Sequence, residues 1–284
     1  MRTRWYGGWV LPVFCLLLAG NPVVAGAQSI AMATDVAGKV TAAGQGISIL
    51  SEIPSDARVE LDAGARLVAV YLKSGEEYSF TGPAQIQFRA SDPEVLSGAK
   101  PQKRGNPLRS SGVRINPVST TQAGFVMRSG RNTARIKLLA LSGTRTLETN
   151  PEFRWLEAEP GLKYQFDLTD ETGKSLIETR VEGSSFRLPA SVQLQADTTY
   201  TWEISVRLSD GRRYVNAGDF SIAPPGLRAQ ANTLRPARDA PVSERVAFAA
   251  WLEQMELRDE ARKYWRVLAA ERPEDERLKA LAAD

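Results

Sequence analysis

The chain has 284 residues, which is long enough for two or three domains with sizeable cores. Its apolar content of 43% and its charged content of 24% are ordinary for a folded soluble protein, and its net charge is +3. The sequence contains no histidine and one cysteine, which excludes Ser-His-Asp and Cys-His catalysis, histidine-ligated zinc and a histidine general base. The sequence contains no motif that is typical of a particular enzymatic reaction.

Residues 1–27 have the pattern of a secretory signal peptide. Arginines near the start precede an apolar run (9–19), and small residues stand just before the expected cleavage after Ala27. The run is shorter than the ~20 residues of a membrane span, and an uncleaved N-terminal anchor is the alternative. Cleavage removes Cys15 and leaves a mature chain with neither cysteine nor histidine and no expected membrane span. Export without disulfides is typical of a bacterial envelope protein, so we expect a periplasmic location.

Residues 29–90 predict a run of short strands joined by tight turns. Apolar residues alternate here with polar or small ones, as in half-buried strands, at Ile47 and Ile49, Val59 and Leu61, Tyr78 and Phe80, and Ile86 and Phe88. The segment 65–72 is a denser apolar run that predicts a central strand, and the turn 73–76 follows it. We therefore expect a small barrel-like or coiled sheet.

The order of residues in this region resembles the FecR-like domain of bacterial envelope proteins. The matching features are a Gly-x-Val start at 38–40, Gly-Ala-Arg before the apolar strand at 64–66, Ser-Gly-Glu at 74–76 and Gly-Pro-Ala at 82–84. These motifs are made of turn residues rather than catalytic ones. The resemblance implies a periplasmic domain that relays signals through protein contacts.

Residues 91–119 predict a linker, because four prolines and several glycine, serine and asparagine residues oppose long regular structure. The stretch 95–147 has no acidic residue and ten basic ones, including Lys100, Lys103, Arg104 and Arg109. One interpretation is a site for anionic partners such as lipid head groups, cell-wall polymers or an acidic protein face. The other is a solvated loop and the polar face of two strands. Nucleic acid is not an expected partner, because the chain is exported and interleaved aromatics are missing.

Residues 120–223 predict an antiparallel β-sandwich, since turn signals recur at roughly 8–12-residue spacing. Apolar residues at period two mark its strands, at Phe125 and Met127, Ile136, Leu138 and Ala140, Tyr164, Phe166 and Leu168, and Tyr200, Trp202, Ile204, Val206 and Leu208. The segment 170–173 predicts a hairpin loop. With Trp155 in an early strand, the pattern resembles a fibronectin type III or immunoglobulin-like domain. We interpret the aromatic residues as core rather than as a sugar-binding platform.

Residues 224–241 predict a second linker, and residues 242–284 predict an α-helical hairpin. Ser243 is the expected N-cap of the first helix, and Pro273 ends the second. The pair resembles a single tetratricopeptide repeat, through the small-large-small-proline spacing of Ala261, Trp265, Leu268 and Pro273.

One such repeat cannot bury both faces of its helices. It must therefore dock on the sandwich, on another copy of the chain or on a partner protein. Trp251 and Met255 are the residues that we expect to form the exposed contact surface of the first helix.

The sequence has no glycine-rich phosphate loop, no C-x-x-C pair and no H-E-x-x-H motif. The acid pairs Glu60/Asp62 and Glu76/Glu77 have the residue types of a glycoside hydrolase, but charged residues on such strands and turns are usually solvated. We therefore predict no enzyme activity, no cofactor and no metal. An enzyme that uses carboxylates alone is a third hypothesis behind the two below.

The predicted fold is mainly β, with a small FecR-like β-domain, an antiparallel sandwich and a C-terminal helical hairpin. The first functional hypothesis is a periplasmic, non-enzymatic binding or scaffold protein that contacts an envelope protein in signalling or envelope organisation. The second is a cell-wall or polysaccharide-binding module that uses the basic stretch 95–147. Fold alone does not choose between them.

Overall fold

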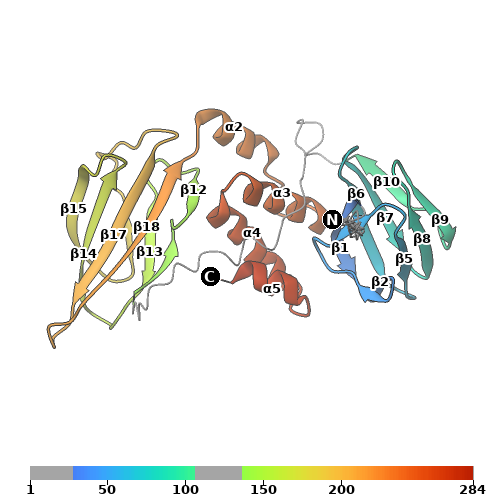
Figure 1. Ribbon diagram of the computed structural model, residues 1–284, viewed down its shortest axis with the longest axis horizontal. Helices are drawn as coiled ribbons and strands as arrows, with labels where there is room; N and C mark the ends of the chain where they lie inside the picture. The colour runs from blue at the N-terminus through green and yellow to red at the C-terminus, as the bar shows by residue number, and fades with distance from the viewer. Residues whose placement is uncertain (1–27, 106–135, 284) are drawn as a thin grey trace, which may run out of the picture.

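The computed structural model describes residues 28–105 and 136–283. These form a first β-unit (28–105), a second β-unit (136–223) and a C-terminal helical unit (225–282). Figure 1 shows the helical unit between the two β-units. The prediction of a mainly β chain with a helical C-terminal end is therefore confirmed. The expected signal peptide (1–27) lies outside the described residues.

The first β-unit consists of two five-stranded antiparallel sheets. One contains β1 (Ser29–Ala37), β4 (Glu52–Pro54), β6 (Arg66–Tyr71), β7 (Glu76–Thr81) and β10 (Gln102–Gly105), in the order β10-β7-β6-β1-β4. The other contains β2 (Val40–Ala42), β3 (Gln45–Gly46), β5 (Arg58–Leu61), β8 (Ala84–Phe88) and β9 (Pro93–Ser97), in the order β3-β2-β5-β8-β9. Apolar side chains of both sheets form one buried cluster, so the unit is two packed sheets where we expected one barrel-like or coiled sheet.

Strand β6 lies at the centre of its sheet, as its dense apolar run predicts. Ala69 and Tyr71 face the core between the two sheets. Val68 and Val70 point to the other face and are also buried. That face is covered because the helical unit packs on it, with Met32 of β1 in the same cluster as the helices. A strand covered on both faces carries a continuous apolar run, so this run reflects the helical cover as well as the central position.

The prediction that residues 91–119 form a linker was wrong at its N-terminal end. β9 begins at Pro93 and pairs with β8, while β10 pairs with β7. Proline is compatible with the first residue of an edge strand, because the hydrogen bond that it cannot donate is not needed there. Residues 106–135, which include Arg109, Phe125 and Met127, lie outside the described residues.

The second β-unit is an antiparallel sandwich with one parallel edge strand. Its smaller sheet contains β11 (Lys137–Ala140), β13 (Glu152–Leu156) and β16 (Ser185–Arg187), in the order β11-β13-β16. Its larger sheet contains β12 (Thr144–Thr146), β14 (Lys163–Asp170), β15 (Ser175–Glu182), β17 (Thr199–Arg207) and β18 (Arg213–Ile222), in the order β12-β18-β17-β14-β15. The expected hairpin loop 170–173 joins β14 to β15, and Gly173 has the positive φ of 81° that the turn requires.

The aromatic residues of the sandwich are core, as predicted. Trp155, Phe166 and Trp202 have no exposed surface. The indole of Trp202 donates a hydrogen bond of 2.7 Å to the carbonyl of Leu141, and the hydroxyl of Tyr164 accepts one of 2.9 Å from the Ala158 amide. These polar atoms are thus satisfied inside the sandwich.

The helical unit contains α2 (Pro225–Leu234), α3 (Val242–Gln254), α4 (Arg258–Glu271) and α5 (Glu276–Ala282). The prediction that 224–241 is a linker was therefore wrong, because α2 occupies most of this segment. Pro225 lies in the first turn of α2, where a backbone N–H has no partner within the helix and its absence costs nothing. The predicted hairpin in 242–284 corresponds to α3 and α4, and α5 follows with Asp275 as its N-cap.

Helix α3 is buried nearly all round, with every residue from Val246 to Leu252 inside the core. It packs against α4 and against β1 of the first β-unit. A helix that is apolar on all sides belongs inside a core rather than on a surface. Pro241, not Ser243, takes the N-cap position of α3. The buried Ser243 hydroxyl instead lies 3.3 Å from the Arg104 guanidinium of β10, which donates to it.

Candidate functional site

The predicted basic site residues Lys103 and Arg104 lie on β10 and are ion-paired within the fold. Lys103 Nζ is 3.0 Å from Glu76 Oε2, and hydrogen bonds to Tyr78 and Glu76 raise the pKa of Lys103. Arg104 Nη2 is 2.7 Å from Glu77 Oε1, and its Nη1 is 3.1 Å from Glu244 Oε1 on α3. Both cations are thus already ion-paired within the fold, and Arg104 joins β10 to β7 and to α3.

The other two predicted basic site residues do not complete a site with them. Lys100 is exposed in the connection before β10, and Arg109 lies outside the described residues. The acid pairs do not converge either. Glu60 and Asp62 are exposed on and after β5, while Glu76 and Glu77 are the ion-pair partners of Lys103 and Arg104 described above. Within the described ranges, no group of three or more acidic or cysteine side chains is placed to hold a metal ion.

The prediction that Trp251 and Met255 form an exposed contact was wrong for Trp251. Its indole is 1% exposed and stacks on Phe248 at a centroid distance of 5.6 Å. Met255 is partly buried at the edge of the same core. The first β-unit and α4 cover this surface, so the helices dock within their own chain. The predicted docking on the sandwich is confirmed in part, because α4 contacts β12, and Leu147 and Ala223 belong to the same core. The contact with the first β-unit is not among the predicted ones.

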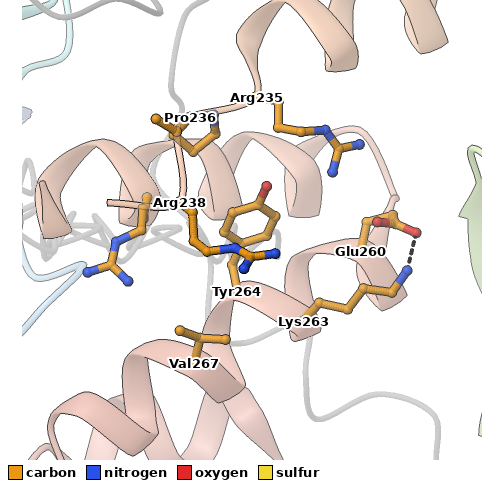
Figure 2. Close-up of a pocket in the computed structure, with 9 residues that line it drawn as sticks. Arg235, Pro236, Arg238, Glu260, Lys263, Tyr264 and Val267 are labelled. Carbon is orange, nitrogen blue, oxygen red and sulfur yellow. Dashed lines mark hydrogen bonds and ion pairs between the residues drawn. The ribbon is translucent and has the colours of Figure 1, made fainter. Parts of the chain in front are cut away.

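A groove of about 430 Å³ opens on the helical unit, between the α2–α3 connection and α4. Figure 2 shows the side chains of Arg235, Arg238 and Tyr264 around this opening. The complete lining is Arg235, Pro236, Ala237, Arg238, Arg245, Glu260, Lys263, Tyr264 and Val267. We call it the basic groove, because it is lined by four cations and one carboxylate.

The cations of the basic groove fall into two classes. Arg245 is held by both carboxylate oxygens of Glu271, each at 2.7 Å, and this hydrogen bonding raises the pKa of Arg245. Lys263 Nζ pairs with Glu260 at 2.6 Å. Arg235 and Arg238 are exposed, and neither guanidinium has an ion-pair or hydrogen-bond partner in the described part of the chain. Among the described residues, these two side chains are therefore the unpaired cations of the groove.

The apolar part of the basic groove comes from α4. The ring of Tyr264 packs edge-on against Phe248 at 5.1 Å and is thereby fixed in place. Val267 lies one turn further along α4 and is 52% exposed, which makes it one of the exposed large apolar residues of the described chain. The groove therefore offers free guanidinium groups beside an apolar surface.

The sequence carries only a weak signal for this groove. Arg235 and Arg238 lie on either side of Pro236 in the segment 224–241, whose sequence predicts a linker. Nothing in the sequence distinguishes this pair of arginines from others, because the groove exists only once the fold brings α4 beside them.

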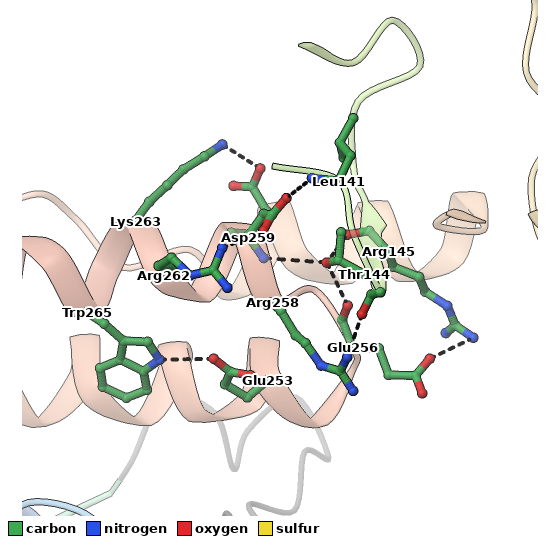
Figure 3. A network of polar contacts seen from close by, with 12 residues as sticks. Leu141, Thr144, Arg145, Glu253, Glu256, Arg258, Asp259, Arg262, Lys263 and Trp265 are labelled. Carbon is green, nitrogen blue, oxygen red and sulfur yellow. Dashed lines mark hydrogen bonds and ion pairs between the residues drawn. The ribbon is translucent and has the colours of Figure 1, made fainter. Parts of the chain in front are cut away.

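The helical unit is joined to the second β-unit by a network of polar contacts (Figure 3). The Leu141 amide donates to the Asp259 carboxylate at 2.6 Å, and the Arg145 amide donates to the Glu256 carbonyl at 2.8 Å. Arg258 of α4 donates to the Gly143 carbonyl at 2.5 Å. Backbone groups take part in all three bonds, which hold the start of α4 and the turn before it against β12 and the loop that precedes it.

The helical unit is joined to the first β-unit through a buried carboxylate. Asp35 on β1 has no exposed surface and pairs with Arg66 of β6 and with Arg272, whose Nη2 lies 2.6 Å from Asp35 Oδ1. Arg272, at the C-terminal end of α4, also donates to the Val36 carbonyl at 2.6 Å. The helical unit thus has bonded contacts with both β-units.

Glu253 of α3 gives the helical unit a pH-dependent stability. Burial raises the pKa of Glu253 above its ordinary value, although the hydrogen bond from the Trp265 indole, at 3.2 Å, opposes the shift. Because the folded chain holds this proton more tightly than the unfolded chain, ionised Glu253 lowers stability at neutral pH. The loss disappears once the pH falls below the ordinary pKa of glutamate, about 4.3.

We therefore expect Glu253→Gln, which keeps an acceptor for Trp265, to raise the melting temperature at pH 7. The gain should shrink to nothing near pH 4 in thermal unfolding followed by circular dichroism. The substitution Glu274→Gln, at an exposed position after α4, serves as the control. A gain that stays constant between pH 4 and pH 7 would show that the charge of Glu253 is not its cause.

Comparisons with known proteins give no family for this chain. No protein-family model matches it, and no curated protein matches it. The solved structure of CopC from Methylosinus trichosporium OB3b is similar to 32% of this chain over 95% of its own length, with 18% identity and a TM-score of 0.25. A β-1,2-glucanase from Parabacteroides distasonis is similar to 73% of this chain, with 11% identity and a TM-score of 0.22, and the chain spans 39% of its length. Neither TM-score supports an inference about activity.

Proposed function

We propose that this protein is a non-enzymatic binding or scaffold protein of the bacterial periplasm that acts in envelope signalling or organisation through contacts with an envelope protein. The observation that carries the proposal is the position of the helical unit, which is bonded to both β-units (Figure 1). Such an arrangement holds two sheet-based units at a fixed spacing. The resemblance of residues 29–90 to the FecR-like domain agrees with this role.

The periplasmic part of the proposal rests on the signal-peptide pattern of residues 1–27. None of the helices in the described ranges is long and apolar enough to cross a membrane. We expect export to remove the segment after Ala27, so that the mature chain begins at Gln28. N-terminal sequencing of the exported protein measures this. A chain that begins at Met1 or at Cys15 would contradict it.

The partner-binding part is tested by crosslinking in intact cells, followed by pull-down of the full chain. We expect one specific envelope protein to be crosslinked at a fixed ratio, because a scaffold presents defined surfaces. A chain that stays bound to insoluble cell wall and yields no protein crosslink would favour the second function instead.

The second candidate function, a cell-wall or polysaccharide-binding module, is supported by the acid-free stretch 95–147. Since Lys103 and Arg104 are ion-paired, the variant that tests it is Lys100→Glu with Arg109→Glu. Under this function, binding to anionic vesicles or wall polymer weakens in the variant and in salt, because exposed charges are screened over ~8–10 Å at physiological ionic strength. Unchanged binding in both conditions removes this function.

A further inference from the structure

We propose that the basic groove binds a short acidic segment of a partner protein that carries an aliphatic side chain beside its carboxylates. This inference rests on the proposed function and specifies the partner surface for it. Its chemistry follows from three features of the groove, namely two free guanidinium groups, an exposed apolar surface and walls that are already in place.

The charge of the groove selects a carboxylate-bearing ligand. Arg235 and Arg238 are exposed and unpaired within the described residues, in contrast to the ion-paired Lys103 and Arg104 of β10. A guanidinium presents a planar fork of donors that matches a carboxylate in bidentate geometry. Arg245 and Lys263 are already paired with Glu271 and Glu260, so Arg235 and Arg238 supply the uncompensated positive charge of the lining.

The apolar surface of the groove selects an aliphatic side chain next to the acid. Val267 is 52% exposed beside the fixed ring of Tyr264. A bound aliphatic group would remove both from water, which favours binding. The groove volume of about 430 Å³ lies in the range of ligand pockets, ~300–1,000 Å³, and is sufficient for a few residues of a peptide.

The walls of the groove need little ordering when a ligand binds. Leu234 and Ala240 are buried and anchor both ends of the segment that carries the two free arginines. Between them, the Ala240 amide donates to the Ala237 carbonyl at 3.1 Å and closes a turn, and Pro236 restricts the backbone. A site that exists before binding loses less conformational entropy.

A peptide fits this groove better than an anionic polysaccharide does. A sugar chain presents hydroxyl groups along its length, and these need hydrogen-bonding partners on the protein. The surface beside the arginines is instead formed by Val267, Ala237, Pro236 and the ring of Tyr264. An acidic polysaccharide would leave its hydroxyl groups against this apolar surface.

The test is a selection of random octapeptides on the full-length exported protein at physiological salt, followed by fluorescence anisotropy of the selected peptides. We expect enriched peptides to pair Asp or Glu with Leu, Ile or Val. The double substitution Arg235→Glu and Arg238→Glu should weaken their binding by ~100-fold or more, because each charged hydrogen-bonding group contributes about a tenfold factor or more. Val267→Gln should weaken it by a smaller factor.

The matched control is Arg154→Glu with Arg180→Glu, which makes the same charge change on β13 and β15 of the second β-unit, away from the groove. It should leave peptide binding within about twofold, and circular dichroism melting checks that all variants are folded. The proposal is overturned if no acidic-aliphatic peptides are enriched, if they bind the Arg235/Arg238 variant equally well, or if polygalacturonate oligosaccharides bind the groove while the peptides do not. Crosslinking of an envelope protein that persists in this variant would overturn the groove assignment and leave the proposed function standing.

Discussion

Replacing Trp251 by alanine is expected to lower the free energy of unfolding by about 3–5 kcal/mol, the usual cost of removing a buried tryptophan. Its indole is 1% exposed in a cluster that contains most of the helical unit together with Met32, Ile49 and Leu50 of the first β-unit. The cavity therefore opens inside the core of the helical unit, beside Phe248. Urea unfolding followed by helical circular dichroism measures the loss.

The control is Val267→Ala on the adjacent helix, where the side chain is 52% exposed. Surface substitutions of this kind change stability by about 0.5 kcal/mol or less. If Trp251→Ala leaves the unfolding curve unchanged but abolishes crosslinking to an envelope protein, Trp251 is a contact residue and contributes nothing to the core.

The strands β6 and β17 were predictable because the order of apolar and polar residues within each strand indicates which of its faces are buried. Period-two alternation in Tyr200, Trp202 and Ile204 places one face of β17 in the sandwich core, and the structure confirms it. The dense run of β6 was also correctly interpreted as a central strand. In both cases the pattern is visible within one strand, although in β6 the second buried face is covered by helices far away in the sequence.

The linker predictions failed because proline was treated as a breaker at positions where it is harmless. Pro93 is the first residue of an edge strand, and Pro225 stands at the first turn of α2. The prediction that Trp251 is exposed failed for another reason. A two-helix hairpin alone exposes one face, whereas here both β1 and α4 pack against α3. That cover comes in part from residues far away in the sequence.

The basic groove was not predictable for the same reason. Arg235 and Arg238 lie on one wall, and Tyr264 and Val267 lie on another helix. Whether an arginine is paired depends on which carboxylates the fold brings close to its guanidinium. Lys103 and Arg104 belong to a conspicuous basic stretch and are paired, whereas the two groove arginines belong to an inconspicuous segment and are free within the described residues.

Replacing Asp35 by alanine is expected to have the second large effect. Its carboxylate has no exposed surface and lies between Arg66 and Arg272, so it connects β6 to the end of α4. Removing one partner of a buried ion pair costs about 3–5 kcal/mol, because the remaining charge is left without compensation. Here the remaining charge includes the Arg272 guanidinium, whose side chain is 17% exposed.

The matched control for this change is Asp62→Ala. Asp62 pairs with Lys39 at 3.5 Å, and the two side chains are 59% and 72% exposed. Exposed pairs of this kind contribute about 0–1 kcal/mol. The difference between the two aspartate variants in urea unfolding therefore isolates the effect of burial.

The segments in which Asp35→Ala increases hydrogen exchange distinguish a docking role for Asp35 from a role inside the first β-unit. We expect hydrogen exchange to increase in α5 and in the loop 47–51, where Arg277 Nη2 reaches the Leu50 carbonyl at 3.5 Å, while β14 and β17 of the second β-unit keep their protection. Arg272→Met should remove much of the penalty of Asp35→Ala, because the double variant leaves one fewer buried charge without a partner. If the two substitutions are simply additive and exchange rises in β6 alone, Asp35 stabilises the first β-unit through Arg66 and does not hold the helical unit to it.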